Sequence, residues 1–193
     1  MEQALAEARK GRFWATPNPH VGCVIVSDNK ILGKGFTQPV GGAHAEIMAL
    51  GACASPRGAT AYVTLEPCAH QGRTGPCVEA LISAGIGRVV GALEDPNPSV
   101  SGKGYDRLRA EGIAVTQGVC AEAARAELAG FLLRMERGWG RVRLKLACSL
   151  DGRTAMASGE SQWITGALAR QDVQRQRAVS SVIITGIGTV LAD

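Results

Sequence analysis

Four side chains in the first half of the sequence could bind and use a metal ion. His44 and Glu46 stand two residues apart in GGAHAEIMAL, at the start of an apolar run. Cys68 and Cys77 each follow a proline within TLEPCAHQGRTGPC. One imidazole and two thiolates are borderline-soft donors, which suit Zn²⁺ better than Mg²⁺ or Ca²⁺. Catalytic zinc sites use three protein ligands and leave one position for water, so we expect His44, Cys68 and Cys77 to hold the ion.

Glu46 is the residue that separates a catalytic zinc site from a structural one. A closed structural site needs a fourth Cys or His, not a carboxylate two residues beyond the His. The order H-x-E followed by P-C is the signature of zinc-dependent base deaminases, in which the Glu is the general acid and base. The cysteine spacing here is C-x₈-C instead of C-x₂-C. A closed structural zinc site and a metal-free chance arrangement remain the alternatives.

The surrounding stretches must bring these side chains together. After a hairpin with Asp28-Asn29 at its turn, helical and extended patterns alternate, which is typical of an α/β fold, a three-layer α/β/α sandwich with a mixed sheet. The helices that carry His44 and Cys77 would then begin at the same edge of the sheet. We expect strands over residues 21–26, 30–36, 59–65 and 88–93, a short strand after 113, and helices over 2–10, 43–53, 77–86, 105–113 and 120–138.

The pattern changes near residue 138. We expect a zinc-dependent deaminase domain over residues 1–138 and the incomplete beginning of a second domain over 139–193. The second segment shows one β-α-β pattern, with a strand after 139, a helix over 165–178 and a strand over 179–188. A single β-α-β unit cannot close a core by itself, and its open edge could mediate self-association into a homo-oligomer.

Composition excludes several classes of partner. The 193 residues are 46% hydrophobic and carry a formal net charge of +4, without a long basic run, so we expect no nucleic acid partner. No apolar stretch approaches the length of a membrane span, and the N-terminus does not resemble a signal peptide, so we expect a cytoplasmic protein. We expect the four cysteines outside the metal motif to be small core residues: Cys23, Cys53, Cys120 and Cys148.

The motifs resemble the deaminase half of the RibD family, the bifunctional riboflavin biosynthesis proteins. The resemblance rests on HAE at 44–46, TLEPCAHQGRTGPC at 64–77, TPNPHVGCVIV at 16–26 and DPNPSVSGKG at 95–104, and it continues to the last residue. It implies a cytidine-deaminase-like sandwich followed by a truncated dihydrofolate-reductase-like segment. It also implies hydrolysis of 2,5-diamino-6-(5-phosphoribosylamino)pyrimidin-4(3H)-one to the 5-aminouracil and ammonia. Guanine, cytosine and tRNA-adenosine deaminases are the alternatives of the same fold.

The resemblance also assigns residues. Asn18, His70 and Arg73 would bind the phosphorylated pyrimidine, although a turn former, a loop cap and a solvated charge are the plainer interpretations. The sequence departs from the family at three places, with Gly75 in place of a proline, Glu127-Leu128 in place of Leu-Asn and Gly140-Arg141 in place of Pro-Tyr. NADPH would serve only a complete reductase domain, so we expect no reductase activity from this chain. In the reductase segment, the positions that match NADPH- and substrate-binding residues are Ser161, Trp163, Arg177, Thr189 and Asp193.

Overall fold

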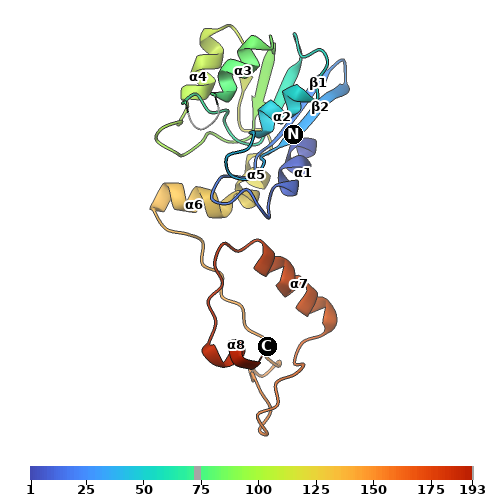
Figure 1. Ribbon diagram of the computed structural model, residues 1–193, viewed down its shortest axis with the longest axis vertical. Helices are drawn as coiled ribbons and strands as arrows, with labels where there is room; N and C mark the ends of the chain where they lie inside the picture. Colours follow the sequence, from blue (N-terminus) through green and yellow to red (C-terminus); the bar gives the residue numbers. More distant parts are fainter. Residues whose placement is uncertain (72–74, 193) are drawn as a thin grey trace. The chain divides into compact units, whose positions relative to one another are not determined.

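The computed structural model describes residues 1–71 and 75–192 (Figure 1). The backbone forms two compact units, Met1–Arg141 and Val142–Asp193, and each is described by itself. Two residues of the predicted substrate and cofactor sites, Arg73 and Asp193, lie outside the described residues. No helix in the described ranges is long and apolar enough to cross a membrane.

A five-stranded mixed sheet forms the centre of the first unit, with the order β2-β1-β3-β4-β5. β1 runs antiparallel to both β2 and β3, whereas β3, β4 and β5 are parallel. The hairpin turns at Asp28 and Asn29, which both have positive φ, as tight two-residue hairpins require. The predicted mixed sheet is confirmed. The strands are β1 (Gly22–Ser27), β2 (Lys30–Phe36), β3 (Thr60–Val63), β4 (Arg88–Gly91) and β5 (Ala114–Thr116).

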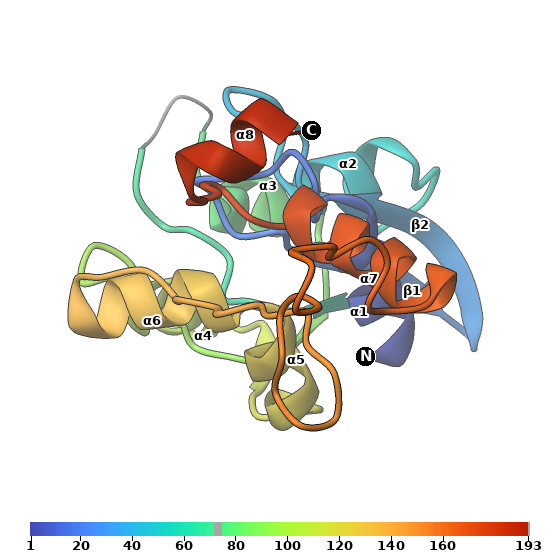
Figure 2. The ribbon, with the colours of Figure 1, turned by 90° about the horizontal axis from the view of Figure 1, so that it is seen from below.

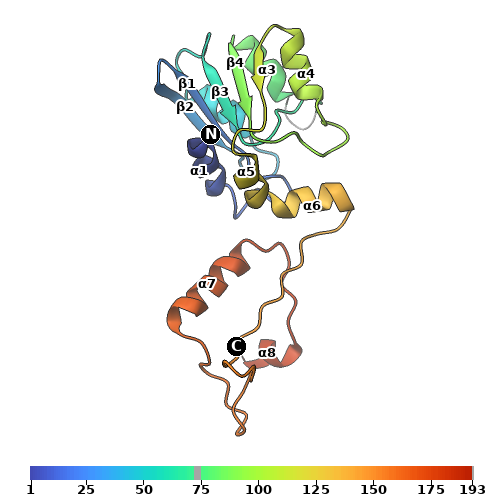
Figure 3. The same ribbon diagram turned by 180° about the vertical axis from the view of Figure 1, so that it is seen from behind.

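Helices cover both faces of this sheet, so the predicted three-layer sandwich is also confirmed. One face carries α2 (Ala45–Gly51), α3 (Cys77–Ser83) and α4 (Lys103–Ala110) (Figure 1). The opposite face carries α1 (Glu2–Lys10) and α5 (Ala121–Glu127), which come to the front in Figure 3. A continuous core of aliphatic side chains fills the space between the layers.

Two glycines on β2 fix the position of α2, the helix that follows His44. A Cβ atom on Gly33 would lie 2.2 Å from the carbonyl oxygen of Ala49, and one on Gly35 would lie 2.3 Å from that of Ala45. The helix backbone therefore rests directly on the edge strand, whose strong bend is seen in Figure 2. A larger side chain at either glycine would push the start of α2 away from the sheet.

The predicted long helix over 120–138 is wrong in one respect, because it is broken at Leu128 into α5 and α6 (Ala129–Arg137). At the break, Leu128 is almost fully buried in the core, while the carboxylate of Glu127 is held by Arg9 and Arg12 from the segment around the end of α1. These distant partners cannot be seen in the local sequence.

The second unit contains α7 (Ala167–Ala178) and α8 (Ile187–Ala192). The helix predicted over 165–178 is confirmed. The strands predicted after 139 and over 179–188 are wrong, because a strand needs a hydrogen-bonded neighbour and no described residue of this unit provides one. Large apolar side chains such as Leu150 and Ile184 are exposed as a result. Of the cysteines assigned to the core, Cys23 and Cys53 are buried, whereas Cys120 and Cys148 are exposed.

Candidate metal centre and active site

The structure brings His44, Cys68 and Cys77 together at the edge of the sheet where α2 and α3 begin. Their ligand atoms all lie within 4.8 Å of one another. The Nδ1 atom of His44 is 3.2 Å from the Sγ atom of Cys77 and 3.6 Å from that of Cys68. In the part of the chain that the structure describes, this cluster has three metal-binding donors and no fourth.

Each of the three residues occupies a position that the fold defines. His44 is the N-cap residue of α2, and Cys77 is the first residue of α3. Cys68 lies in the loop after β3, where its Sγ accepts a hydrogen bond from the backbone N–H of Cys77 at 3.4 Å. The carbonyl of Cys68 also accepts the N–H of Val78 at 3.2 Å, so the loop is tied to α3 by two bonds.

This donor set fits zinc. With Zn–N near 2.0–2.1 Å and Zn–S near 2.3 Å, a tetrahedral ion places a ring nitrogen and a sulfur about 3.6 Å apart. The two observed N–S distances, 3.2 and 3.6 Å, are close to that value. An ion held by these residues would keep a fourth position for water, as catalytic zinc sites do.

Proton affinities in the cluster favour metal binding. The hydrogen bond from the thiol of Cys77, together with those from His44 and the N–H of Cys77, lowers the pKa of Cys68 to about 4. The thiol of Cys77 donates in that pair and is buried, which raises its pKa. The bond to Cys68 also raises the pKa of His44. These hydrogen bonds therefore favour the thiolate of Cys68, the form in which cysteine binds a metal.

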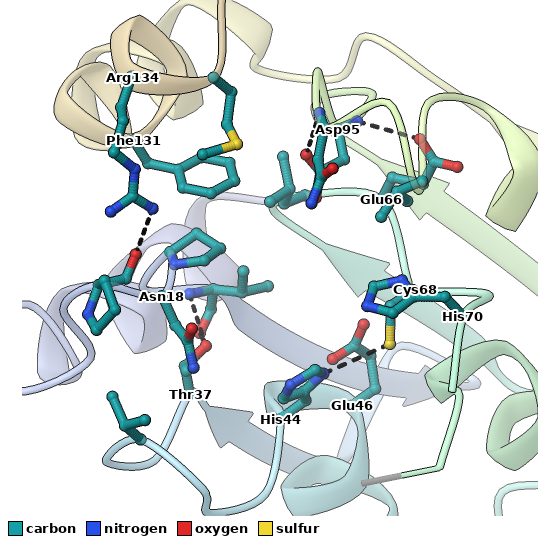
Figure 4. A pocket seen from close by; sticks show the side chains of 18 of the residues that line it. Asn18, Thr37, His44, Glu46, Glu66, Cys68, His70, Asp95, Phe131 and Arg134 are labelled. Carbon is teal, nitrogen blue, oxygen red and sulfur yellow. Dashed lines mark hydrogen bonds between the residues drawn. The ribbon is translucent and has the colours of Figure 1, made fainter. Parts of the chain in front are cut away.

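Glu46 lies beside these ligands on the first turn of α2 (Figure 4). Only 4% of its surface is exposed. Burial raises the pKa of Glu46 to about 7, against the opposing effect of a hydrogen bond from its backbone. A carboxyl group with this proton affinity can both accept and donate a proton at neutral pH, as a general acid and base must.

His44, Cys68 and Glu46 line a pocket with a volume of about 480 Å³. That size lies within the usual range for small-molecule sites. Asn18 and His70, two residues predicted to bind substrate, are also on its wall, whereas Arg73 lies outside the described residues. Loop residues and α6 provide further parts of the wall: Asp95, Asn97 and Val100 from the loop, and Phe131, Arg134 and Met135 from α6.

Comparison with known proteins agrees with this geometry. Residues 1–93 match the zinc-binding region of cytidine and deoxycytidylate deaminases, and residues 141–193 match the C-terminal domain of RibD. Riboflavin biosynthesis protein RibD of Escherichia coli is 56% identical over 194 aligned positions, which cover 100% of this chain and 53% of the relative. The whole length of this chain is thus similar to one part of the RibD proteins.

Solved RibD structures show the same similarity. Acinetobacter baumannii RibD is 55% identical, with a TM-score of 0.93 over 100% of this chain and 54% of that one. The diaminohydroxyphosphoribosylaminopyrimidine deaminase/5-amino-6-(5-phosphoribosylamino)uracil reductase of Thermotoga maritima is 42% identical, with a TM-score of 0.94 over 100% of this chain and 56% of that one. The chain thus spans about half the length of the RibD relatives it matches.

Sequence reasoning missed Glu66, which precedes the Pro-Cys pair. Only 4% of its surface is exposed, and its carboxylate accepts three backbone hydrogen bonds from residues 95–104. The donors lie 29 to 38 residues further along the chain. The sequence shows only an acidic residue two positions before the metal ligand Cys68, and this does not reveal such distant hydrogen-bond partners.

The residues predicted for the reductase half do not converge in the described part of the second unit. Ser161, Trp163, Arg177 and Thr189 all have exposed side chains. The guanidinium of Arg170 lies 4.4 Å from the centre of the Trp163 ring, so this ring makes a cation–π contact. A hollow in this unit is lined by other residues: Ser149, Arg153, Ala155, Met156, Ala157 and Ile164. The roles of the four residues remain predictions.

Proposed function

We propose that this chain catalyses the hydrolytic deamination of 2,5-diamino-6-(5-phosphoribosylamino)pyrimidin-4(3H)-one, which yields 5-amino-6-(5-phosphoribosylamino)uracil and ammonia. One observation carries the proposal. Three zinc-type donors, His44, Cys68 and Cys77, converge in one cluster. Two of them, His44 and Cys68, line a pocket together with the buried carboxyl group of Glu46. The deaminase and reductase names of the Thermotoga maritima relative support the choice of substrate.

His44, Cys68 and Cys77 would hold the zinc ion. When bound, zinc supplies a water molecule that is acidic enough to act as a nucleophile near neutral pH. Glu46 would accept the proton of that water, transfer it to a ring nitrogen, and protonate the amine as its bond to the ring carbon breaks. General acid–base catalysis of this kind contributes about 10²- to 10⁴-fold to a rate.

The remaining pocket residues would orient the substrate. Asn18 would donate and accept hydrogen bonds at the pyrimidine edge, and His70 would bind the ribose phosphate chain from the segment between the two cysteines. Arg73 lies on the same segment of the sequence, and its guanidinium group suits phosphate oxygens. Asn18 and His70 line the same pocket as His44, Cys68 and Glu46, which supports binding of a small polar ring beside the metal ligands.

Ammonia release from the zinc-loaded protein tests the proposal. We expect turnover with the diaminopyrimidine phosphate and none with guanine or cytosine; release from guanine or cytosine alone would refute the proposed substrate. Glu46→Gln preserves the shape of the side chain but cannot shuttle protons. It should keep one zinc ion per chain while kcat falls by about 10²- to 10⁴-fold. Activity that survives this change would refute the role of Glu46.

We further propose that residues 139–193 belong to a reductase domain in which Ser161, Trp163, Arg177, Thr189 and Asp193 contribute to NADPH and substrate binding. The match of residues 141–193 to the RibD C-terminal domain supports this. Trp163 is 67% exposed in this segment, so in a complete reductase domain NADPH binding beside it should change tryptophan fluorescence. A homo-oligomer is a second prediction, which light scattering on the purified protein would test.

A further inference from the structure

The carboxylate of Glu66 connects the loop that carries a metal ligand to a second loop on the pocket wall. Glu66 stands two residues before Cys68. Its Oε2 atom accepts the backbone N–H of Asp95 at 3.1 Å and that of Gly102 at 2.9 Å. Its Oε1 atom accepts the N–H of Gly104 at 2.8 Å. Figure 4 shows the bond to the Asp95 backbone at the upper end of the pocket.

These bonds replace a local helix cap. The first N–H groups of a helix lack partners within the helix, and a side chain at the N-cap usually satisfies them. The N-cap residue of α4 is Gly102, which has no side chain to do this. Glu66 satisfies the N–H groups of Gly102 and Gly104 from the other loop, so α4 begins at Lys103 instead of at the predicted residue 105.

The start of α4 packs tightly against the loop that carries Glu66. A Cβ atom on Gly104 would lie 2.1 Å from the carbonyl oxygen of Pro67 and 3.0 Å from Oε1 of Glu66. The start of α4 is therefore in direct contact with the Glu66-Pro67 backbone. Any movement of residues 95–104 away from the pocket must break the bonds to Glu66.

The loop held in this way forms part of the pocket wall. Asp95, Asn97 and Val100 line the pocket, and the Asp95 carboxylate accepts the N–H of Asn97 at 2.9 Å. Asn97 in turn accepts the N–H of Ser99 at 3.1 Å through its side chain. These local bonds shape the loop, but the bonds to Glu66 are the ones that attach it to the metal-ligand segment.

We infer that Glu66 is a positioning residue that holds residues 95–104 in place as a wall for the substrate, and so determines substrate affinity and not the chemical step. This rests on the proposed deaminase function. Apparent affinity falls in proportion to the fraction of molecules whose binding-competent wall is formed. The zinc donors and Glu46 belong to other segments, so loss of the wall should leave them assembled.

Glu66→Gln tests the inference because it replaces one acceptor oxygen by a donor that faces a backbone N–H. Hydrogen exchange of the amides in residues 95–104 should become faster, while exchange in β3 and β4 stays unchanged. KM for the diaminopyrimidine phosphate should rise about tenfold or more, since a buried unsatisfied group strongly favours loop opening. The kcat value should change less than about threefold, and the zinc content should stay at one ion per chain.

Two further variants complete the design. Glu94→Gln is the matched control, because Glu94 is an exposed carboxylate beside the same loop that accepts none of the three bonds; it should leave exchange and KM unchanged. Gly104→Ala keeps Glu66 but inserts a Cβ into the contact, and it should reproduce the rise in KM. If Glu66→Gln fails to fold, the KM value and the loop exchange of Gly104→Ala test the inference in its place.

The outcomes separate this inference from the proposed function. Unchanged loop exchange, or faster exchange without a rise in KM, overturns the role of Glu66 as a positioning residue. A fall in kcat at constant KM, or loss of zinc, overturns it as well, because Glu66 would then act on the chemistry or only support the metal site. If the wild-type protein does not deaminate the pyrimidine, the proposed function fails, while exchange still shows whether Glu66 holds the loop.

Discussion

Glu127, the last residue of α5, is expected to stabilise the contact between α5 and α1. The size of this stabilisation should depend on pH. Its carboxylate is 12% exposed and pairs with Arg9 at 2.8 Å and with Arg12. The side chains of Arg9 and Arg12 are 55% and 37% exposed, so water partly screens the two ion pairs. The upper part of the range for exposed ion pairs gives about 0.5–1 kcal/mol for each pair. Glu127→Gln should therefore lower the free energy of unfolding by about 1–2 kcal/mol at pH 7.

The sign of the pH dependence follows from the pKa. Burial by itself raises the pKa of Glu127, but the hydrogen bonds and charges of Arg9 and Arg12 outweigh it, and the net pKa is lowered. A carboxyl group with a lowered folded pKa contributes its stability fully above the unfolded pKa. That contribution is lost as the pH falls through the folded value. The difference between the wild-type and variant proteins should thus be largest near neutral pH and shrink in acid.

Urea denaturation of both proteins at several pH values measures this difference. Glu122→Gln is the matched control, because Glu122 is exposed on the same helix, and a surface change of this kind should alter stability by less than about 0.5 kcal/mol. Equal stability of Glu127→Gln and wild type at pH 7 would refute the reasoning. So would a difference that is the same in acid as at neutral pH, since it would then reflect packing and not charge.

Three further predictions concern the site and the core. Relative to the protein with free zinc at about 1,000 times Kd, removal of zinc by a chelator should lower the stability of the wild-type protein by about 4 kcal/mol in thermal melts. The chelator should not change the stability of the Cys68→Ser variant. Arg134 donates to the backbone of the turn that carries Asn18, at 2.7 Å, so Arg134→Met should raise KM with little change in zinc content. The buried hydroxyl of Tyr105 donates to a backbone carbonyl at 2.8 Å, so Tyr105→Phe should cost about 1–2 kcal/mol in urea denaturation, whereas Tyr62→Phe, at a half-buried side chain, should cost less.

Local patterns in the sequence were sufficient for features that depend on local physics. The hairpin at Asp28-Asn29 was predictable because those residue types tolerate positive φ. The start of α3 at Cys77 was predictable because it follows a proline, and the apolar periodicity that continues from there is helical. The convergence of His44 with the cysteines could be anticipated because helices that follow parallel strands begin at the same sheet edge.

Features that depend on distant partners could not be found in this way. The earlier start of α4 coincides with bonds to the carboxylate of Glu66, and the break at Leu128 lies beside the ion pairs of Glu127 with Arg9 and Arg12 from the beginning of the chain. The strand expected over 179–188 had the right composition but has no hydrogen-bonded neighbour among the described residues of its unit. In each case the deciding group is separated in sequence from the element that it controls.

The spacing between the two cysteines gives a physical reason to expect metal binding and substrate binding to be linked. Eight residues separate Cys68 from Cys77, and His70, which lines the pocket, lies among them. His70 lies two residues after the metal ligand Cys68, so a bound ion restrains its position in the pocket. Glu66 lies two residues before Cys68 and holds the wall loop over 95–104. Loss of the metal should then loosen both His70 and the wall loop, so the metal-free protein should bind the substrate more weakly even in an assay that involves no turnover.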